Sequence, residues 1–214
     1  MDSVSLTIDN VSVHTHKGAK ILWAALDSGI YIPNLCALRE KDEPSVSCRL
    51  CFVEIEGRPE PVLSCAETVQ EGMIVTTKSP KVERLRRSAA ELLLSAHNVE
   101  CKQCFKNGKC ELQRIAKHLK ITLKPKNLRD LSTSFPLDDT HPKFFYDQSK
   151  CVLCGKCVEI CHHHGLGILN FAYRGLGTRI FLSSIDLDSE NFCMSCERCE
   201  KICPVGALIP KIMK

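Results

Sequence analysis

The sequence predicts an α+β protein built from three consecutive parts, each organised around a group of cysteines. Three observations lead to this prediction. The first part alternates apolar and polar residues, the second has two stripes of apolar residues at helical spacing, and the third contains one cysteine-rich motif twice. We expect the parts to span residues 1–79, 80–120 and 143–214, with a linker over residues 121–142.

Cysteine is far more frequent than a chain of ordinary composition would need. Of 214 residues, 15 are cysteine and only 6% are aromatic, so small cores need support from disulfides, zinc or iron–sulfur clusters. An odd count does not suit a closed disulfide framework. No secretory signal precedes the first strand, and no apolar run approaches the roughly 20 residues of a membrane helix. We therefore expect a cytoplasmic protein with no transmembrane segment, whose reduced cysteines bind metal.

Positive charge is concentrated in the middle of the chain. The net charge is +4, but residues 78–129 hold fourteen Lys and Arg against four Glu. Because no aromatic residues are interleaved there for stacking on bases, we expect no nucleic-acid partner. A face for an acidic partner protein, or compensation of negatively charged thiolate clusters, accounts for the charge.

Residues 1–79 have the pattern of a small sheet with one helix. Apolar residues alternate over 4–13 around the turn residues Asp9 and Asn10, which predicts a hairpin. Apolar residues at 21–26 then recur at helical spacing, and Gly29 ends that helix. The further strands that we expect are Cys51–Ile55 and Met73–Thr77. A hairpin, a packed helix and returning strands favour a β-grasp sheet.

Residues 80–120 have the pattern of two helices joined by a turn. Ser79 suits the cap and Pro80 the first position of a helix that ends near His97. A second helix starts around Cys110. The following linker holds three prolines and has no sustained period.

The strongest motif is a repeat of C-x2-C-x2-C-x3-C, at residues 151–161 and 193–203. Three cysteines at steps of three wrap three corners of an iron–sulfur cubane, whereas the fourth cannot easily reach back and ligates the other cluster. The two predicted [4Fe–4S] ligand sets are Cys151, Cys154, Cys157 and Cys203, and Cys193, Cys196, Cys199 and Cys161. A pair of zinc sites, the alternative, usually shows two separated CxxC pairs.

Two further groups of ligands precede this repeat. The turn between the predicted helices offers H-x3-C-x2-C-x5-C, in His97, Cys101, Cys104 and Cys110. On spacing alone, zinc held by three cysteines and one histidine competes with a cluster there. The first part offers a relative of the plant-type [2Fe–2S] pattern with a longer first gap, in Cys36, Cys48, Cys51 and Cys65. Zinc is again the alternative, and the four groups together use all fifteen cysteines.

The remaining motifs do not indicate catalysis. His162, His163 and His164 follow a ligand and are interpreted as a polar shell or simple surface. Gly165-Leu-Gly and Gly175-Leu-Gly do not continue as dinucleotide fingerprints, and suit the turns of a hairpin over residues 168–173 and 178–182. The sequence shows no P-loop and no nucleophile–base pair, so we expect no catalytic residue and no activity of the chain alone.

The order of motifs resembles the small diaphorase subunit of NAD(P)-linked bidirectional [NiFe] hydrogenases. It also resembles the N-terminal region of the complex I large iron–sulfur subunit, of many [FeFe]-hydrogenases and of some formate dehydrogenases. The matching runs are IPNLCALRE, SCRLCFVEIEG, VLSCAETVQEGMIV, ELLLSAHNVECKQCFKNGKCELQ, YDQSKCVLCGKCVEIC and FAYRGLGTRI. The resemblance implies a [2Fe–2S] cluster on the Cys36 group and a [4Fe–4S] cluster on the His97 group, hence one [2Fe–2S] and three [4Fe–4S] clusters. Two departures concern loop shape: Ser45-Val46-Ser47, where the family often has Gly, and Asn98, where it often has Pro.

What the resemblance implies for function is electron transfer. The chain would pass single electrons between an NAD(P)H-oxidising flavoprotein subunit and a second catalytic subunit, with a hydrogenase as the first choice. An electron-bifurcating transhydrogenase, a formate dehydrogenase or an [FeFe]-hydrogenase complex is the alternative, and a zinc-binding scaffold is an alternative of another class. Since the chain ends at Lys214 without a catalytic domain, we expect a separate subunit.

Overall fold

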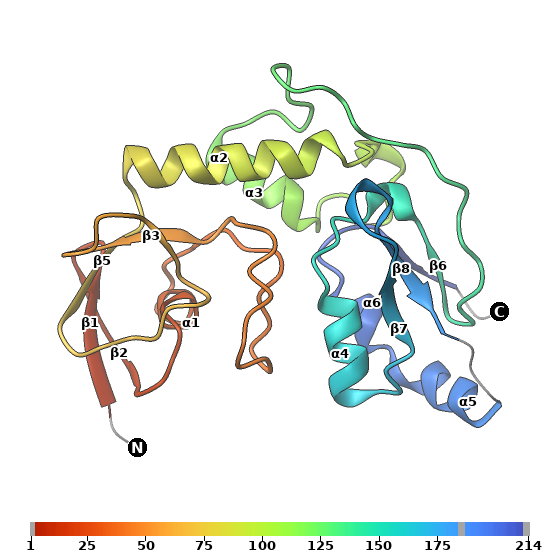
Figure 1. Ribbon diagram of the computed structural model, residues 1–214, viewed down its shortest axis with the longest axis horizontal. Helices are drawn as coiled ribbons and strands as arrows, with labels where there is room; N and C mark the ends of the chain where they lie inside the picture. Colours follow the sequence, from red (N-terminus) through yellow and green to blue (C-terminus); the bar gives the residue numbers. More distant parts are fainter. Residues whose placement is uncertain (1–2, 184–186, 212–214) are drawn as a thin grey trace. The chain divides into compact units, whose positions relative to one another are not determined.

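The computed structural model describes residues 3–183 and 187–211 (Figure 1). By their contacts the residues form two compact units, Met1–Glu91 with Ile115–Ile121, and Leu92–Arg114 with Thr122–Lys214. The three domain boundaries expected from the sequence stay a prediction. Within the described residues, no helix is long and apolar enough to cross a membrane.

A five-stranded sheet of order β2-β1-β5-β3-β4 forms the centre of the first unit. Its strands are β1 (Ser3–Ile8), β2 (Val11–His16), β3 (Phe52–Ile55), β4 (Val62–Leu63) and β5 (Met73–Thr76). β1 pairs antiparallel with β2 and parallel with β5, and β3 pairs antiparallel with both β4 and β5. With one helix packed against it, this mixed sheet is the expected β-grasp fold. The two-residue strand β4 was not expected, because so short a segment shows no alternation.

The hairpin between β1 and β2 turns on two residues in left-handed conformation. Asp9 has φ 49° and Asn10 has φ 68°, the pair of positive φ angles that a type I′ turn requires. The turn fixes a register in which Ile8 faces Val11. Leu6 and Ile8 therefore point into the core, where they are at most 2% exposed.

The helix α1 (Ile21–Asp27) ends in a Schellman motif. Gly29 adopts φ +77°, its N–H donates to the carbonyl of Leu26 (3.1 Å), and the N–H of Ile30 donates to the carbonyl of Ala25 (2.9 Å). This ending turns the chain sharply into the loop that carries Cys36.

Two longer helices, α2 (Pro80–Ser95) and α3 (Glu111–Leu119), flank the His97 motif in sequence. Ser79 caps α2 as predicted, because its Oγ accepts a hydrogen bond from the N–H of Val82 at 3.2 Å. The buried stripe of α3 is Leu112, Ile115, Ala116 and Leu119. These are the residues whose spacing predicted the helix.

The second unit combines short helices with two small two-stranded sheets. Its α-helices are α4 (Lys156–His164), α5 (Leu187–Cys196) and α6 (Arg198–Ile202). Three 3-10 turns accompany them: η1 (Cys101–Gln103), η2 (Gln148–Lys150) and η3 (Gly175–Gly177). Its strands are β6 (Phe144–Tyr146) with β9 (Leu208–Pro210), and β7 (Leu169–Ala172) with β8 (Arg179–Leu182). The β7–β8 hairpin was predicted, whereas the β6–β9 pair was not.

The segment 121–142 contains no helix or strand, as expected of the linker. Two backbone contacts nevertheless attach it to neighbouring segments. The N–H of Leu131 donates to the carbonyl of Ser95 (2.7 Å), and Asp138 forms an isolated bridge with Tyr146.

Candidate metal centres

The first group of predicted ligands lies in the interior of the first unit. Each of its four thiols belongs to a residue that is at most 6% exposed: Cys36, Cys48, Cys51 and Cys65. They form two close pairs. The Sγ atoms of Cys36 and Cys48 lie 3.4 Å apart, and the thiols of Cys51 and Cys65 share a hydrogen bond.

This pairing fits a [2Fe–2S] cluster, because each of the two irons takes two of the four cysteine ligands. Within each pair, the hydrogen bond from the partner thiol lowers the pKa of one member, Cys36 or Cys51. Thiolates are the form in which cysteine binds iron.

The strands β3 and β4 hold one of these pairs in place. Both the backbone N–H and the hydroxyl of Ser64 donate to the carbonyl of Cys51, at 3.0 and 2.8 Å. Cys51 and Cys65 are thereby fixed at neighbouring strand ends. The loop before them is strained, since Val46 adopts φ 43° and Arg49 φ 54° without being glycine.

No pattern in the sequence indicated that a buried guanidinium lies next to this group. Arg86, on α2, is 2% exposed. Its Nε–H and Nη2–H donate to the carbonyl of Phe52 (3.1 and 2.5 Å), and its Nη1–H donates to the carbonyl of Thr77 (3.0 Å). Burial lowers the pKa of Arg86 to about 10, and the thiolate of Cys51 opposes this change. Arg86 therefore stays charged at neutral pH beside the Cys51 end of the centre.

The second group, His97, Cys101, Cys104 and Cys110, lies between α2 and α3 in the sequence and belongs to the second unit. The Nδ1 atom of His97 is buried and neither accepts nor donates a hydrogen bond. Burial also lowers the pKa of His97 to about 4, so the ring is neutral at pH 7, as a metal-binding imidazole must be. An orphaned, neutral ring nitrogen four residues before the Cys101–Cys104 pair in the sequence fits a histidine ligand.

Gly206, in the C-terminal segment, lets the backbone pass close to the second group of ligands. A Cβ atom at Gly206 would overlap the Sγ of Cys104, so only glycine lets the backbone approach this sulfur. The N–H of Glu111 also donates to the carbonyl of Pro204 at 2.9 Å. The segment 204–206 is therefore held against the second group.

The third and fourth groups are built across two helices that lie side by side, α4 and α6 (Figure 1). Helix α4 carries Cys157 and Cys161, while α6 carries Cys199 and is followed at once by Cys203. In each pair the two cysteines are four residues apart, about one helical turn or 6 Å. The two cysteines of each pair therefore belong to different groups: Cys157 and Cys203 to the third, and Cys161 and Cys199 to the fourth.

One pocket brings together the sulfurs of the first motif and the last cysteine of the chain: Cys151, Cys154, Cys157 and Cys203. Burial raises the pKa of Cys154 to about 12, and the thiols of Cys203 and Cys151 add to the rise. The four thiols are therefore close enough to repel one another as anions, which bound iron would relieve.

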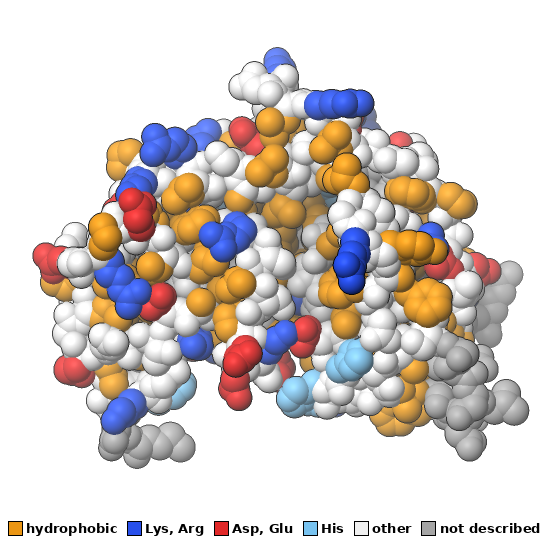
Figure 2. Space-filling view, viewed as in Figure 1, with side chains coloured by type: hydrophobic (Ala, Val, Ile, Leu, Met, Phe, Trp, Pro, Cys, Tyr) orange, Lys and Arg blue, Asp and Glu red, His pale blue; other side chains and the backbone are white. Residues whose placement is uncertain are grey.

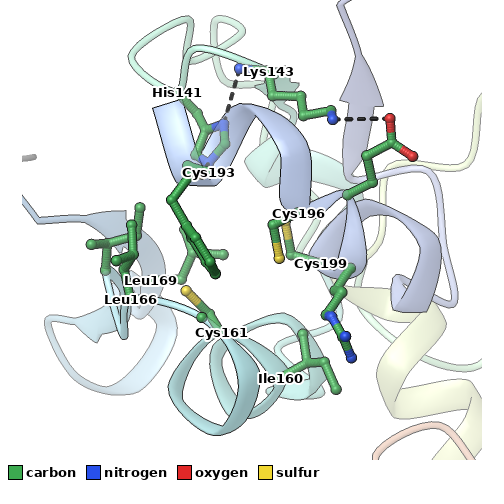
Figure 3. Close-up of a pocket in the computed structure, with 14 residues that line it drawn as sticks. His141, Lys143, Ile160, Cys161, Leu166, Leu169, Cys193, Cys196 and Cys199 are labelled. Atoms are coloured by element: carbon green, nitrogen blue, oxygen red, sulfur yellow. Dashed lines mark hydrogen bonds and ion pairs between the residues drawn. The ribbon is translucent and has the colours of Figure 1, made fainter. Parts of the chain in front are cut away.

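A second pocket brings together the complementary set: Cys161, Cys193, Cys196 and Cys199. Figure 3 shows the side chains of Cys161, Cys196 and Cys199 around this space. Burial raises the pKa of Cys199 to about 12, and the neighbouring thiols of Cys193, Cys161 and Cys196 raise it further.

His162 is the first of the three histidines that follow Cys161. Its Nε2 forms a hydrogen bond with the Oδ1 of Asn170 at 3.0 Å.

The donor types alone are compatible with zinc as well as with clusters. In the described part of the chain, no three His, Cys, Asp or Glu side chains converge closely enough to hold one ion. A zinc site would need all four donors within about 2.3 Å of one ion.

Family models match three stretches of the chain. Residues 1–80 match a 2Fe-2S iron-sulfur cluster binding domain, residues 86–124 match the iron-sulfur binding region of NADH-ubiquinone oxidoreductase G, and residues 150–207 match a 4Fe-4S dicluster domain. The chain therefore carries domains of both the [2Fe–2S] and the [4Fe–4S] type.

Comparison with whole proteins decides the family. The gamma subunit of the NAD-reducing hydrogenase HoxS of Cupriavidus necator is 30% identical over 98% of this chain and 88% of its own length. The chain belongs to this gamma-subunit family. A crystal structure of an NAD+-reducing [NiFe]-hydrogenase contains a chain that is similar to this gamma-family protein, with 34% identity and a TM-score of 0.85, over 99% of this chain and 88% of that one.

Other relatives of this gamma-family chain are much longer. The NADP-reducing hydrogenase subunit HndD of Solidesulfovibrio fructosivorans is 34% identical over 98% of this chain, which spans 36% of that relative. The alpha subunit of the NADPH-Fe(3+) oxidoreductase of Geobacter sulfurreducens is 36% identical over 99% of this chain, which spans 24% of that subunit. The chain thus matches about a third or less of these proteins.

Proposed function

We propose that this gamma-family chain relays single electrons through four iron–sulfur clusters. The electrons pass between an NAD(P)H-oxidising flavoprotein subunit and a second catalytic subunit, which is a hydrogenase. The observation that carries the proposal is the ligand arrangement, since four groups of four donors use all fifteen cysteines and His97.

The clusters are assigned by group. A [2Fe–2S] cluster binds the two thiol pairs of the first unit, Cys36 with Cys48 and Cys51 with Cys65. A [4Fe–4S] cluster binds His97, Cys101, Cys104 and Cys110. Two more bind in crossed fashion: one to Cys151, Cys154, Cys157 and Cys203, and one to Cys193, Cys196, Cys199 and Cys161. The pairing of thiols, the orphaned Nδ1 of His97 and the two four-cysteine pockets support these assignments.

The chain contributes binding and environment, and no substrate chemistry. Each bound cluster supplies the uptake and release of one electron. The protein holds the clusters by thiolate and imidazole, shields them by burial and places polar groups near the ligands. No residue of the chain is assigned a catalytic role, so NAD(P)H is oxidised by the flavoprotein subunit in this proposal.

An apolar surface on the β7–β8 hairpin supports membership in a complex. Its large side chains are 47–86% exposed: Phe171, Tyr173, Leu176 and Phe181. Figure 2 shows hydrophobic side chains gathered over the part of the surface formed by these strands. The register pairs Phe171 with Ile180 and Phe181 with Asn170, so the exposed side chains lie on both faces of the hairpin. Large exposed apolar residues concentrated on one element favour a protein contact, so we assign the hairpin to a subunit contact in the cytoplasm.

A second candidate partner comes from the longer relatives. The match to a subunit of an NADPH-Fe(3+) oxidoreductase favours the same relay in a complex without a hydrogenase. A transhydrogenase or a formate dehydrogenase would use the four clusters in the same way.

Purification of the tagged chain from its native host under anaerobic conditions tests this proposal. We expect a flavoprotein and a hydrogenase subunit to co-purify, and NAD(P)H to reduce the clusters only when the flavoprotein is present. A dehydrogenase of another class in place of the hydrogenase would favour the second candidate. Isolation of the chain with zinc and no redox partner would contradict the relay itself.

A further inference from the structure

Two buried side chains outside the sixteen ligand positions reach cysteine sulfurs of the third and fourth groups. His141 is 3% exposed and Tyr146 is 6% exposed. They lie five residues apart, before and within the short strand β6, and neither forms part of the cysteine motifs. No sequence pattern marked His141, and Tyr146 opens the run YDQSKCVLCGKCVEIC without an assigned role.

The hydrogen bonds of His141 fix which ring nitrogen carries the proton. Its Nδ1 accepts a hydrogen bond from the backbone N–H of Lys143 at 3.1 Å (Figure 3). The neutral ring must therefore carry its proton on Nε2. That atom lies 3.3 Å from the Sγ of Cys193, within the distance expected for a hydrogen bond to sulfur. His141 consequently donates to Cys193.

The ring of His141 has little freedom to leave this position. It stacks on Phe144 with centroids 3.6 Å apart and an angle of 16° between the planes. Its backbone carbonyl accepts a hydrogen bond from the Nζ of Lys211 at 2.7 Å. The stacking on Phe144 and the hydrogen bond to the backbone carbonyl therefore both hold the ring in place.

Tyr146 makes a matching contact in the other pocket. Its hydroxyl oxygen accepts a hydrogen bond from the N–H of Ile180 at 3.3 Å, so the hydroxyl hydrogen is left to donate. Tyr146 and Cys151 line the same pocket, and the hydroxyl is within hydrogen-bonding reach of the Cys151 sulfur. Tyr146 is held by β9, where it faces Leu208. One short segment therefore supplies a donor to each of the two groups.

We propose that His141 and Tyr146 are positioning residues that set the reduction potentials of the two crossed clusters independently, His141 through Cys193 and Tyr146 through Cys151. This inference rests on the cluster assignment proposed above. Reduction adds negative charge to the cluster and its sulfurs, so a donor to sulfur stabilises the reduced form and raises the potential. The N–H of His141 acts on the cluster of Cys193 only, and the O–H of Tyr146 acts on the cluster of Cys151 only.

Two substitutions in the full chain, reconstituted with iron and sulfide, test the proposal. His141→Phe keeps an aromatic ring to stack on Phe144 but removes the donor, and Tyr146→Phe removes one hydroxyl group. Redox titration followed by EPR measures each potential. The donor stabilises the reduced cluster more than the oxidised one, so its removal should shift the equilibrium up to about tenfold toward the oxidised form, or up to about 59 mV for one electron.

The two variants are controls for each other. His141→Phe should lower only the potential of the Cys193 cluster, and Tyr146→Phe only that of the Cys151 cluster. His141→Gln, which keeps an N–H donor, should restore most of the His141 shift. Unchanged potentials, or equal shifts of both clusters in both variants, would overturn the proposal, because equal shifts indicate a general structural effect.

Loss of the clusters and failure of this inference give different results. If the unaltered chain binds no iron and sulfide, the proposed function fails. If it binds them and the potentials do not respond, only this inference fails. Should His141→Phe load no iron, Tyr146→Phe decides by itself, since an unchanged potential of the Cys151 cluster in that variant refutes the proposal.

Discussion

His97 is the one side chain among the sixteen predicted ligands that is not a thiol. Its Nδ1 is buried and without a hydrogen bond, and a buried polar atom in this condition costs free energy unless it binds something. In the proposed assignment iron satisfies it, and no other side chain of the group can replace it.

We predict that His97→Cys keeps its cluster with a changed potential, whereas His97→Ala leaves one iron without a protein ligand. Iron analysis and EPR of the reduced variants provide the measurement. Asn98→Ala, next to it in the sequence, is the control and should leave the spectrum unchanged. An unaltered iron content and spectrum in His97→Ala would remove His97 from the ligands.

Arg86 is a residue whose role depends on burial and not on a motif. Its guanidinium satisfies two backbone carbonyls, those of Phe52 and Thr77. Arg86→Met would leave these buried acceptors without donors, at a cost of about 1–3 kcal/mol. We therefore predict that the urea concentration at the midpoint of unfolding is lower for this variant than for the unaltered chain. The exposed neighbour Arg87, changed to Met, is the matched control and should have little effect; equal losses for both would show that the buried hydrogen bonds contribute nothing.

At the scale of elements, the proposed crossed ligation depends on the two neighbouring helices α4 and α6. We predict that Cys203→Ala damages the cluster of Cys151, Cys154 and Cys157, about forty residues away in the sequence, while the cluster of Cys193 is largely kept. Cys161→Ala is the reciprocal variant and should do the reverse. EPR of the two reduced variants distinguishes the centres. Selective loss of the Cys193 cluster in Cys203→Ala would mean that each motif binds its own four ligands.

The elements also show how far the sequence predicts this fold. The first hairpin and α2 follow from local residues: Asp9 and Asn10 make the turn, and Ser79 makes the cap. The strands β4, β6 and β9 were not predicted, since each has two or three residues and forms only through partners elsewhere in the chain.

The same distinction applies to the centres. Ligand types and spacings are local, so the four groups of donors could be derived from the sequence. Arg86, Gly206 and His141 belong to no motif, and Tyr146 lies in a matching run without an assigned role. Each matters only because folding brings it to a sulfur or to a buried carbonyl. The ligands therefore stay a prediction from the sequence, whereas their surroundings follow only from the fold.

At the scale of the whole molecule, the proposed relay needs a partner at each end. We predict that the purified, flavin-free chain neither oxidises NADH nor evolves hydrogen, because no described side chains form a nucleotide site or a catalytic centre in our account. Dye-linked NADH oxidation and hydrogen evolution are the assays, and dithionite reduction of the clusters is the positive control. Steady NADH–dye activity in the chain alone would overturn this view.

The proposed relay requires that the fifteen cysteines and His97 hold one [2Fe–2S] and three [4Fe–4S] clusters. Chemical analysis of iron, zinc and acid-labile sulfide in the anaerobically purified chain tests this most directly. We expect about fourteen iron and about fourteen sulfide per chain, with no stoichiometric zinc. About four zinc per chain and no sulfide would contradict it.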